Sequence, residues 1–393
     1  MARSPARMSR GGPGPLGFPP DAFAVALTCL PGMGPARLSA ILRTESAARA
    51  WCRIRGGAAW HDAAVVAALG SRADALTASW RQAAAEIDPA VVWQAIVEQG
   101  IGVAVVGSAG YPPVLAADIE PPGVVFHRGS PDVVAGPRVA VVGTRQCSAT
   151  GAAIACELGR DLASAGVAVV SGLASGIDAA GHRGALSAAR DGNGAPPIGV
   201  VGSGLDVVYP RGQAELWRAV ARHGVLLSEA PLGARPERWR FPARNRIIAA
   251  LADLVVVVES HRRGGSMHTV DEADRRGIDV MAVPGSVRAP ASAGTNGLLA
   301  EGRAPVCSAD DVLVALGLGP AGRRPRDDAR PRPDPADATV LDAVGWQPAT
   351  LDQIGMRTGH GLAVVAPALD RLCEAGWVAR RGGWYERIAG GTP

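Results

Sequence analysis

Lysine is absent from this sequence of 393 residues, so all 40 of its fixed basic charges are arginines, set against 36 acidic residues. A phosphate-binding loop of the Walker type requires a lysine, and that class of nucleotide site is therefore excluded. A genome rich in G and C would explain the bias. Its physical consequence is that every basic side chain can grip a phosphate through two parallel hydrogen bonds and can stack on a ring.

Other absences narrow the class of protein. No apolar run approaches the roughly 18 residues that cross a bilayer, and glycine and proline interrupt the N-terminal stretch where a signal peptide would need an apolar core. The six cysteines are scattered, with no pair at zinc-ligand spacing and no disulfide framework. We expect a cytoplasmic protein without a membrane anchor, with reduced and mostly buried thiols, no metal and no cofactor.

The length and a hydrophobic content of 48% predict two or three folded domains. Residues 1–20 are interpreted as a disordered lead-in, and alanine-rich helical periodicity predicts a helical domain over 21–99. An α/β domain follows over 100–317, and a linker rich in arginine and proline over 318–336. Residues 337–390 contain three short helical patterns and a hairpin pattern with a Gly382-Gly383 turn, which together predict a winged-helix module.

Within the α/β domain, short β-branched runs alternate with amphipathic stretches. The expected strands are 138–142, 167–171, 198–201, 225–228, 254–259 and 279–283. Valine-rich strands joined by crossover helices predict a Rossmann-like, doubly wound and mostly parallel sheet that is covered on both faces.

Glycine-rich segments follow four of these strands, at 143–145, 171–178, 202–206 and 264–269. In an open parallel sheet, ligands bind beyond the carboxyl ends of the strands, and glycine there lets backbone N–H groups approach a phosphate. A tight turn would explain any one of these loops alone, whereas four on one edge favour phosphate binding. The dinucleotide fingerprint is not met, because Gly202 and Gly204 lack the third glycine.

Positive charge gathers in one segment. Residues 235–246 hold five arginines and one glutamate, a local net charge of +4 that equals the excess of the whole chain. Trp239 and Phe241 alternate with Arg238 and Arg240, and aromatic faces between phosphate-binding arginines are typical of single-stranded nucleic-acid sites. In the alternative interpretation, Trp239 belongs to a core and some of the arginines form a solvated helix start.

Ordered motifs in this chain resemble those of the DNA-processing protein A family, also called DprA or Smf. They are VAVVGTR (139–145), SGLASGID (171–178), GSGLDVVYP (202–210), LLSEAPLG (226–233), FPARNRIIA (241–249), GGSMHT (264–269) and AVPG (282–285). The resemblance covers residues 23–317, and LPGMGPARL (30–38) is similar to a SAM-like or helix-hairpin-helix element. One departure is Ser175, at a position where the family commonly has arginine.

The resemblance implies a homodimeric protein without catalytic activity that binds and protects incoming single-stranded DNA in natural transformation and recombination. It further implies loading of the recombinase RecA onto that strand, with a single-strand-binding protein as another partner. The residues that it places on the DNA path, together with Arg240 from the arginine cluster, are Arg145, Ser171, Gly172, Gly176, Asp178, Arg240, Phe241, Arg244, Asn245, Arg246, Gly265 and Ser266.

Two other functions are compatible with parts of the sequence. The segment with Gly264, Gly265 and Glu272 loosely echoes the PGGxGTxxE signature of nucleotide phosphoribohydrolases with a lysine-decarboxylase-like fold. A winged-helix regulator of double-stranded DNA is the second, but Arg371 is the only base in the expected recognition helix, residues 363–374, which is poor for reading the major groove.

Overall fold

The computed structural model describes residues 18–190, 194–319, 330–345 and 347–388. Most of the expected lead-in and residues 320–329 of the expected linker fall outside this part of the chain. The chain divides into two compact units. The first comprises the chain up to Arg128 with Gly202–Val207 and Leu227–Ala243, and the second comprises Gly129–Val201, Val208–Leu226 and Arg244 onward.

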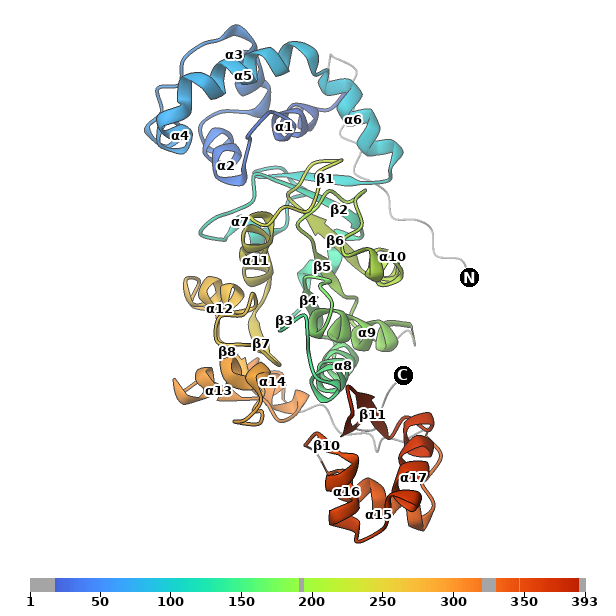
Figure 1. The fold of residues 1–393 in the computed structure, drawn as a ribbon. Coiled ribbons are helices and arrows are strands. Elements are labelled where there is room, and N and C mark those ends of the chain that lie inside the picture. The colour runs from blue at the N-terminus through green and yellow to red at the C-terminus, as the bar shows by residue number, and fades with distance from the viewer. Residues whose placement is uncertain (1–17, 191–193, 320–329, 346, 389–393) are drawn as a thin grey trace. The chain divides into compact units, whose positions relative to one another are not determined.

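Among the described residues, nine strands form one large sheet (Figure 1). They are β1 (Gly102–Val105), β2 (Val124–Gly129), β3 (Arg138–Val142), β4 (Ala168–Ser171), β5 (Ile198–Val200), β6 (Val225–Ser228), β7 (Leu254–Val257), β8 (Val280–Ala282) and β9 (Ala304–Pro305). Their order is β1-β2-β6-β5-β4-β3-β7-β8-β9. β3 pairs in parallel with β4 and β7, and β7 with β8, whereas β1 and β2 pair antiparallel. The expected mostly parallel α/β sheet is confirmed.

The first unit is built mainly from helices. They are α1 (Asp21–Thr28), α2 (Pro35–Thr44), α3 (Ala47–Gly56), α4 (Ala63–Leu69), η1 (Gly70–Arg72), α5 (Ala73–Glu86), α6 (Pro89–Glu98) and α7 (Pro113–Ala116). Trp51 and Trp80 are fully buried between them. The indole of Trp80 donates to the carbonyl of Pro31 at 2.8 Å, which fixes the turn before α2 on the helical core.

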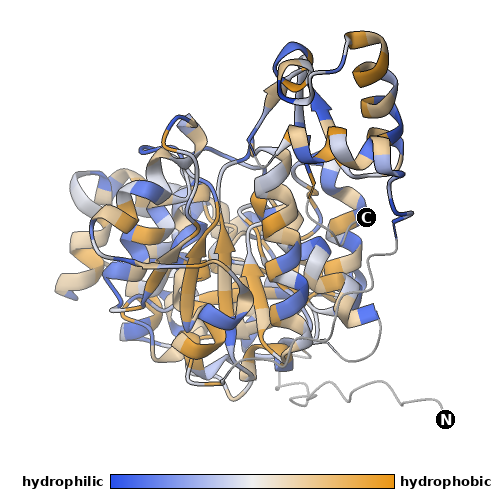
Figure 2. Cartoon of the chain, turned by 90° about the horizontal axis from the view of Figure 1, so that it is seen from below, coloured by the Kyte–Doolittle hydropathy of each residue, from blue (hydrophilic) through white to orange (hydrophobic). Residues whose placement is uncertain are grey.

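The second unit holds the parallel core of the sheet. Its helices are η2 (Pro131–Ala135), α8 (Ala149–Ser164), α9 (Ile177–Arg190), η3 (Arg211–Gln213), α10 (Ala214–His223), α12 (Met267–Asp274), η4 (Pro290–Ser292), α13 (Ala293–Ala300) and α14 (Ala309–Ala315), and α11 (Arg240–Leu251) enters it at Arg244. α8 and α9 approach closely because Gly159 has no side chain: a Cβ there would lie 2.1 Å from the carbonyl oxygen of Gly181. Apolar strands lie between helices in Figure 2, as two-sided cover requires.

All six expected parallel-sheet strands begin within one residue of their observed start, and β3 and β6 have the expected limits. β1, β2 and β9 were not expected as strands. β7 ends at Val257 instead of residue 259, because the chain turns at Glu259, whose backbone carbonyl accepts a hydrogen bond from Thr144 N–H at 2.7 Å.

The C-terminal part of the second unit has its own small core. It consists of α15 (Pro335–Val344), α16 (Leu351–Thr358), α17 (Leu362–Glu374) and a three-stranded antiparallel sheet of β10 (Ala349–Thr350), β11 (Val378–Arg381) and β12 (Trp384–Arg387). Gly382 and Gly383 both have positive φ, as the two-residue turn between β11 and β12 needs. Ordered contacts begin before residue 337: Arg330 donates to the carbonyls of Gly376 and Ile388, and Asp334 caps α15.

All six cysteines are free, but the expectation of mostly buried thiols is wrong. Cys52 and Cys307 are exposed, and the other four are only half-buried; Cys147, Cys156 and Cys373 pack against a core without being enclosed by it. In the segments that the structure describes, no helix is both long and apolar enough to cross a bilayer.

Candidate nucleic-acid interface

The strand order of the second unit reverses beside β3. From β3 the chain proceeds through β4 and β5 on one side, while β7 and β8 lie on the other. Loops after β3, β4 and β7 therefore meet at a topological switch point, where open α/β sheets bind their ligands. Hydrogen bonds join all three loops: Ile177 N–H donates to the carbonyl of Thr144 at 3.2 Å, and Thr144 N–H donates to Glu259.

The loop after β4 has a conformation that few residues tolerate. Gly176 has a φ of +85°, and a Cβ there would lie 2.3 Å from the carbonyl oxygen of Thr144. Leu173 has a φ of +58° although it is not a glycine, and its side chain is fully buried. Such strained backbone persists only where its surroundings impose it, and it is frequent at ligand sites.

Two buried side chains of opposite charge, Arg244 and Asp178, lie against this loop. Arg244 and Asp178 are 7% and 6% exposed, and Gly172 N–H donates to the Asp178 carboxylate at 3.2 Å. Burial raises the pKa of Asp178, an effect that the positive charge of Arg244 opposes. Burial likewise lowers the pKa of Arg244, and Asp178 opposes it. The two side chains lie beneath the backbone, so their role in this conformation is to hold the loop.

The start of α11 in this unit is also tied to the loop after β7. Asn245 Nδ2 donates to the carbonyl of Gly265 at 3.2 Å, and Ser266 Oγ donates to Ser260 Oγ at 2.8 Å. Arg246 is only 5% exposed. Residues 244–246 thus face the interior, whereas their charge alone had suggested a row of exposed phosphate ligands.

The structure separates the expected DNA contacts of the second unit by exposure. Arg145 and Gly265 are exposed and Gly176 is half-buried. Ser171 is fully buried, and its hydroxyl donates to the carbonyl of Val141 at 2.7 Å, so it joins two strands. The remaining members of this set are buried: Gly172, Asp178, Arg244, Asn245, Arg246 and Ser266.

A carboxylate occupies the place where a Rossmann fold would hold a pyrophosphate. Glu259 accepts hydrogen bonds from the backbone N–H and the hydroxyl of Ser148, the N-cap of α8, at 2.9 and 2.6 Å. Its carboxyl group also fills the space beside Gly151, where a Cβ would lie 2.4 Å from the carboxyl carbon. This carboxylate takes the place of a pyrophosphate on the N-cap of α8, which agrees with the missing dinucleotide fingerprint.

In the first unit, the arginine-aromatic segment is accessible. Trp239 is 46% exposed and therefore does not belong to a core, and the guanidinium carbon of Arg240 lies 4.4 Å from its ring centroid. The indole N–H of Trp239 donates to the carboxylate of Glu237. Phe241 is half-buried. Arg240 Nε also lies 4.0 Å from the Glu237 carboxylate, so the exposed ring offers a stacking face beside an arginine whose charge is partly compensated.

The glycine loop at 202–206, also in the first unit, serves as a tight turn. Gly204 N–H donates to the carbonyl of Ala234 at 2.9 Å, and the Asp206 carboxylate accepts from Gly233 N–H. A Cβ on Gly204 would lie 2.5 Å from the carbonyl oxygen of Pro231. Close packing of two backbone segments explains the glycine here.

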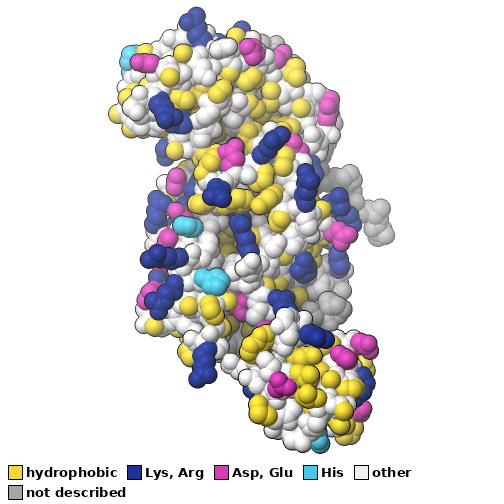
Figure 3. Space-filling model, in the orientation of Figure 1, with side chains coloured by type: hydrophobic (Ala, Val, Ile, Leu, Met, Phe, Trp, Pro, Cys, Tyr) yellow, Lys and Arg dark blue, Asp and Glu magenta, His cyan; other side chains and the backbone are white. Residues whose placement is uncertain are grey.

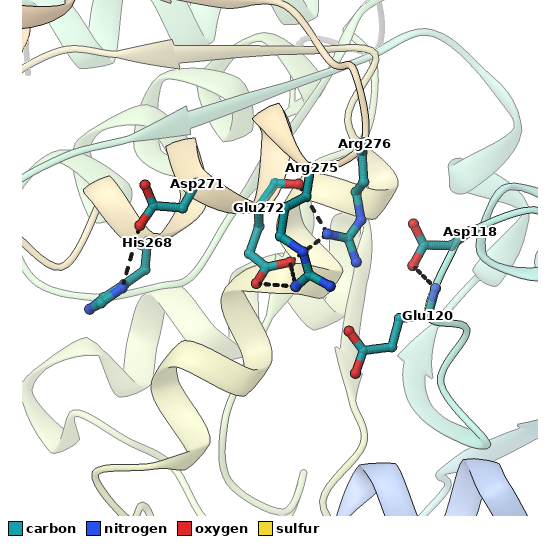
Figure 4. A network of polar contacts seen from close by, with 7 residues as sticks. All are labelled: Asp118, Glu120, His268, Asp271, Glu272, Arg275 and Arg276. Carbon is teal, nitrogen blue, oxygen red and sulfur yellow. Dashed lines mark hydrogen bonds and ion pairs between the residues drawn. The ribbon is translucent and has the colours of Figure 1, made fainter. Parts of the chain in front are cut away.

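Glu272, the acidic residue of the nucleotide phosphoribohydrolase alternative, forms ion pairs with neighbouring arginines. Figure 4 shows the Glu272 carboxylate of α12 paired with Arg275, at 3.0 Å, and with Arg276, both just beyond the end of that helix. His268 lies 3.9 Å from Asp271 on the same helix. His182 is fully buried, and burial lowers its pKa to about 4, so its imidazole is neutral. No group of three His, Cys, Asp or Glu side chains suited to a metal occurs within residues 18–190, 194–319, 330–345 and 347–388.

Two exposed arginines at this edge were missed from the sequence. Arg262 and Arg263 precede Gly264 in the loop after β7, and the dibasic pair beside two glycines was an available signal. Arginine side chains are dispersed over the face seen in Figure 3, with carboxylates between them, so local placement decides which of them can bind an anion.

Comparison with known proteins leads to one family. The family model of the DNA recombination-mediator protein A matches residues 102–317. A DNA processing protein DprA of Bacillus subtilis is 36% identical over 220 residues, which cover 56% of this chain and 72% of that protein. Protein Smf of Escherichia coli is 35% identical over 289 residues, 71% of this chain and 75% of its own.

Structural similarity leads to the same family. The X-ray structure of DNA processing protein A from Streptococcus pneumoniae matches with a TM-score of 0.61 at 31% identity, over 75% of this chain and 96% of that one. The family match includes the loops after β3, β4 and β7 and the whole of α11. From its sequence and its fold, this chain belongs to the DNA recombination-mediator protein A family.

Proposed function

We propose that this protein binds single-stranded DNA and acts on it without catalysis. Phosphates lie against the loops after β3, β4 and β7, where Arg145 and Gly265 are exposed. The positive ends of α9 and α12 begin at the same loops and favour anions. Trp239 and Arg240 supply a second surface suited to stacked bases. Membership in a family whose relatives are named DNA processing proteins supports the same ligand.

One observation carries this proposal. Arg145 is exposed on a loop that Gly176 approaches so closely that no side chain would fit between them. Arg145 is therefore an exposed cation at the topological switch point, next to the backbone of Gly176. An open site of this kind suits a phosphodiester of a long strand better than a small metabolite, which would need an enclosed pocket.

The test is equilibrium binding of a labelled oligo(dT) strand in a salt series. Three or four phosphate contacts predict a slope of log K against log salt of about −2 to −3 for a single strand. Unlabelled duplex of the same length should compete poorly. A slope near zero, or equal affinity for duplex, would contradict the proposal.

Protection of incoming DNA and loading of RecA during natural transformation form the finer part of the proposal. Family membership supports them, as it supports a homodimer and a single-strand-binding protein as a further partner. The assay is RecA filament formation on a strand already covered by single-strand-binding protein, with and without this protein. Sedimentation equilibrium measures the oligomer, and failure to accelerate filament formation would remove RecA loading from the proposal.

The C-terminal part is proposed to be a winged-helix module that does not read duplex DNA. Its three helices and the hairpin of β11 and β12 support the assignment. In α17, Arg371 forms two hydrogen bonds with the Asp337 carboxylate, so the base of the expected recognition helix is already paired. Specific duplex binding that is lost in Arg371→Ala would contradict this part of the proposal.

A further inference from the structure

The hairpin of β11 and β12 contacts the DNA-facing edge of the same unit. Arg381, the last residue of β11, donates to the carbonyl of Cys147 at 2.7 Å. The Glu386 carboxylate on β12 accepts from Ala149 N–H, at the start of α8, at 2.9 Å. These hydrogen bonds flank Ser148 and fix the hairpin where the loop after β3 leads into α8.

A pocket of about 400 Å³ opens at this junction. Its lining includes Arg145 from the loop after β3, Arg183 from α9, Arg381 from the hairpin and the backbone at Gly176. All three arginines are exposed residues. Within the described part of the chain, no carboxylate lines this pocket.

The partners of two of these arginines leave their charge uncompensated. Arg183 donates to the amide oxygen of Gln213 at 3.0 Å, and Arg381 donates to a backbone carbonyl. Burial and, after it, the negative charge of Glu259 raise the pKa of the Cys147 thiol in the pocket wall, and the positive charges of Arg381 and Arg183 both oppose that rise. Three guanidinium groups around one small space, without a carboxylate in the wall, favour an anion with several oxygen atoms.

We infer that this pocket binds a phosphodiester group of the bound single strand, and that the C-terminal module supplies one of its three arginines. The inference rests on the proposed single-strand binding, because Arg145 and Gly176 belong both to the pocket and to the proposed phosphate path. Arg381 thus gives the module a direct part in strand binding and extends the path beyond the family-matched residues 102–317.

The test compares full-length variants in the oligo(dT) salt series. Arg381→Ala should make the slope shallower by about 0.7, the value of one phosphate contact on a single strand. Arg380→Ala is the matched control: it removes the same charge from the preceding position of β11, where Arg380 lies over the ring of Tyr385 at 5.7 Å and does not line the pocket. Its slope should equal that of the unaltered protein.

Further variants separate phosphate binding from docking of the hairpin. Arg381→Gln keeps a donor for the Cys147 carbonyl but removes the charge, so its slope should fall as in Arg381→Ala. The loss of oligo(dT) affinity in the double variant Arg183→Ala, Arg381→Ala should be smaller than the sum of the losses in the two single variants, because both arginines bind one phosphate.

Several outcomes would overturn the inference. If Arg381→Gln binds oligo(dT) with the same salt slope as the unaltered protein, Arg381 only holds the hairpin on the Cys147 carbonyl and does not bind a phosphate. Tighter binding by Arg381→Ala would show that the hairpin obstructs the strand. If the unaltered protein binds with the expected slope, Arg145→Ala weakens it and Arg381→Ala does not, the inference fails while the proposed function stands. Absence of salt-dependent strand binding in the unaltered protein would remove both.

Discussion

The guanidinium of Arg244 lies directly against the Cα of Gly172: a Cβ on residue 172 would be only 1.5 Å from Arg244 Nη1. The arginine is buried, and its positive charge opposes the rise in the pKa of Asp178 that burial causes. Glycine is therefore required at this position by the side chain of a residue 72 positions later in the chain, and the loop after β4 packs on two buried side chains of opposite charge.

Gly172→Ala should displace the Arg244 guanidinium and destabilise the protein. Forcing one methyl group into a filled interior costs about 1–3 kcal/mol of unfolding free energy. Urea unfolding measures it, and oligo(dT) binding should weaken in parallel. Gly297→Ala, in α13 where nothing lies within 4 Å of a new Cβ, is the control and should be neutral or slightly stabilising. Equal stability of the two variants would contradict the packing argument.

Substitution of an exposed arginine should affect strand binding alone, whereas substitution of the buried arginines should also lower the melting temperature. Arg145→Ala should make the salt slope shallower by about 0.7 and leave the melting temperature unchanged, because the side chain is exposed. Arg244→Ala together with Arg246→Ala should abolish retention of oligo(dT) and also lower the melting temperature. Removing the partner of a buried charge costs about 3–5 kcal/mol. A double variant that melts like the unaltered protein would show that these arginines do not support the loop.

Trp239→Ala should weaken strand binding without changing the salt slope. Stacking of a base on an aromatic side chain is worth about 1–3 kcal/mol, or about 5- to 160-fold in Kd. Trp60→Ala is a matched control, since Trp60 also lies beneath an arginine, Arg53, at 5.2 Å. Unchanged affinity in Trp239→Ala, or the same loss in both variants, would place base stacking elsewhere.

Stability should fall in mild acid because of His182. Burial lowers its pKa from 6.5 to about 4, so the unfolded chain binds a proton that the folded protein excludes. Its contribution is complete above pH 6.5 and is lost as the pH falls towards 4, by about 1.4 kcal/mol per pH unit and about 3 kcal/mol in all. His182→Gln should flatten this part of the profile of unfolding free energy against pH. A variant with the slope of the unaltered protein would contradict the assignment.

Local pattern was sufficient for much of the fold. β3 and β6 lie where valine-rich runs predicted them, because strands buried on both faces are apolar throughout. β1 and β2 were missed, since they pair antiparallel and lie outside the pattern of parallel strands joined by crossover helices. The turn at Gly382 and Gly383 was predictable because two glycines with positive φ suit a tight hairpin.

For the candidate site, local pattern was sufficient to locate the glycine-rich loops, because parallel strands bring their carboxyl ends to one edge of the sheet whatever their order. Exposure was decided by tertiary structure. Arg145 and Arg244 carry the same charge, yet one is exposed and the other lies under a loop beside Asp178, because α11 turns residues 244–246 inward. The contact of Arg381 with Cys147 joins residues 234 positions apart, and only the packing of the hairpin on α8 could bring them together.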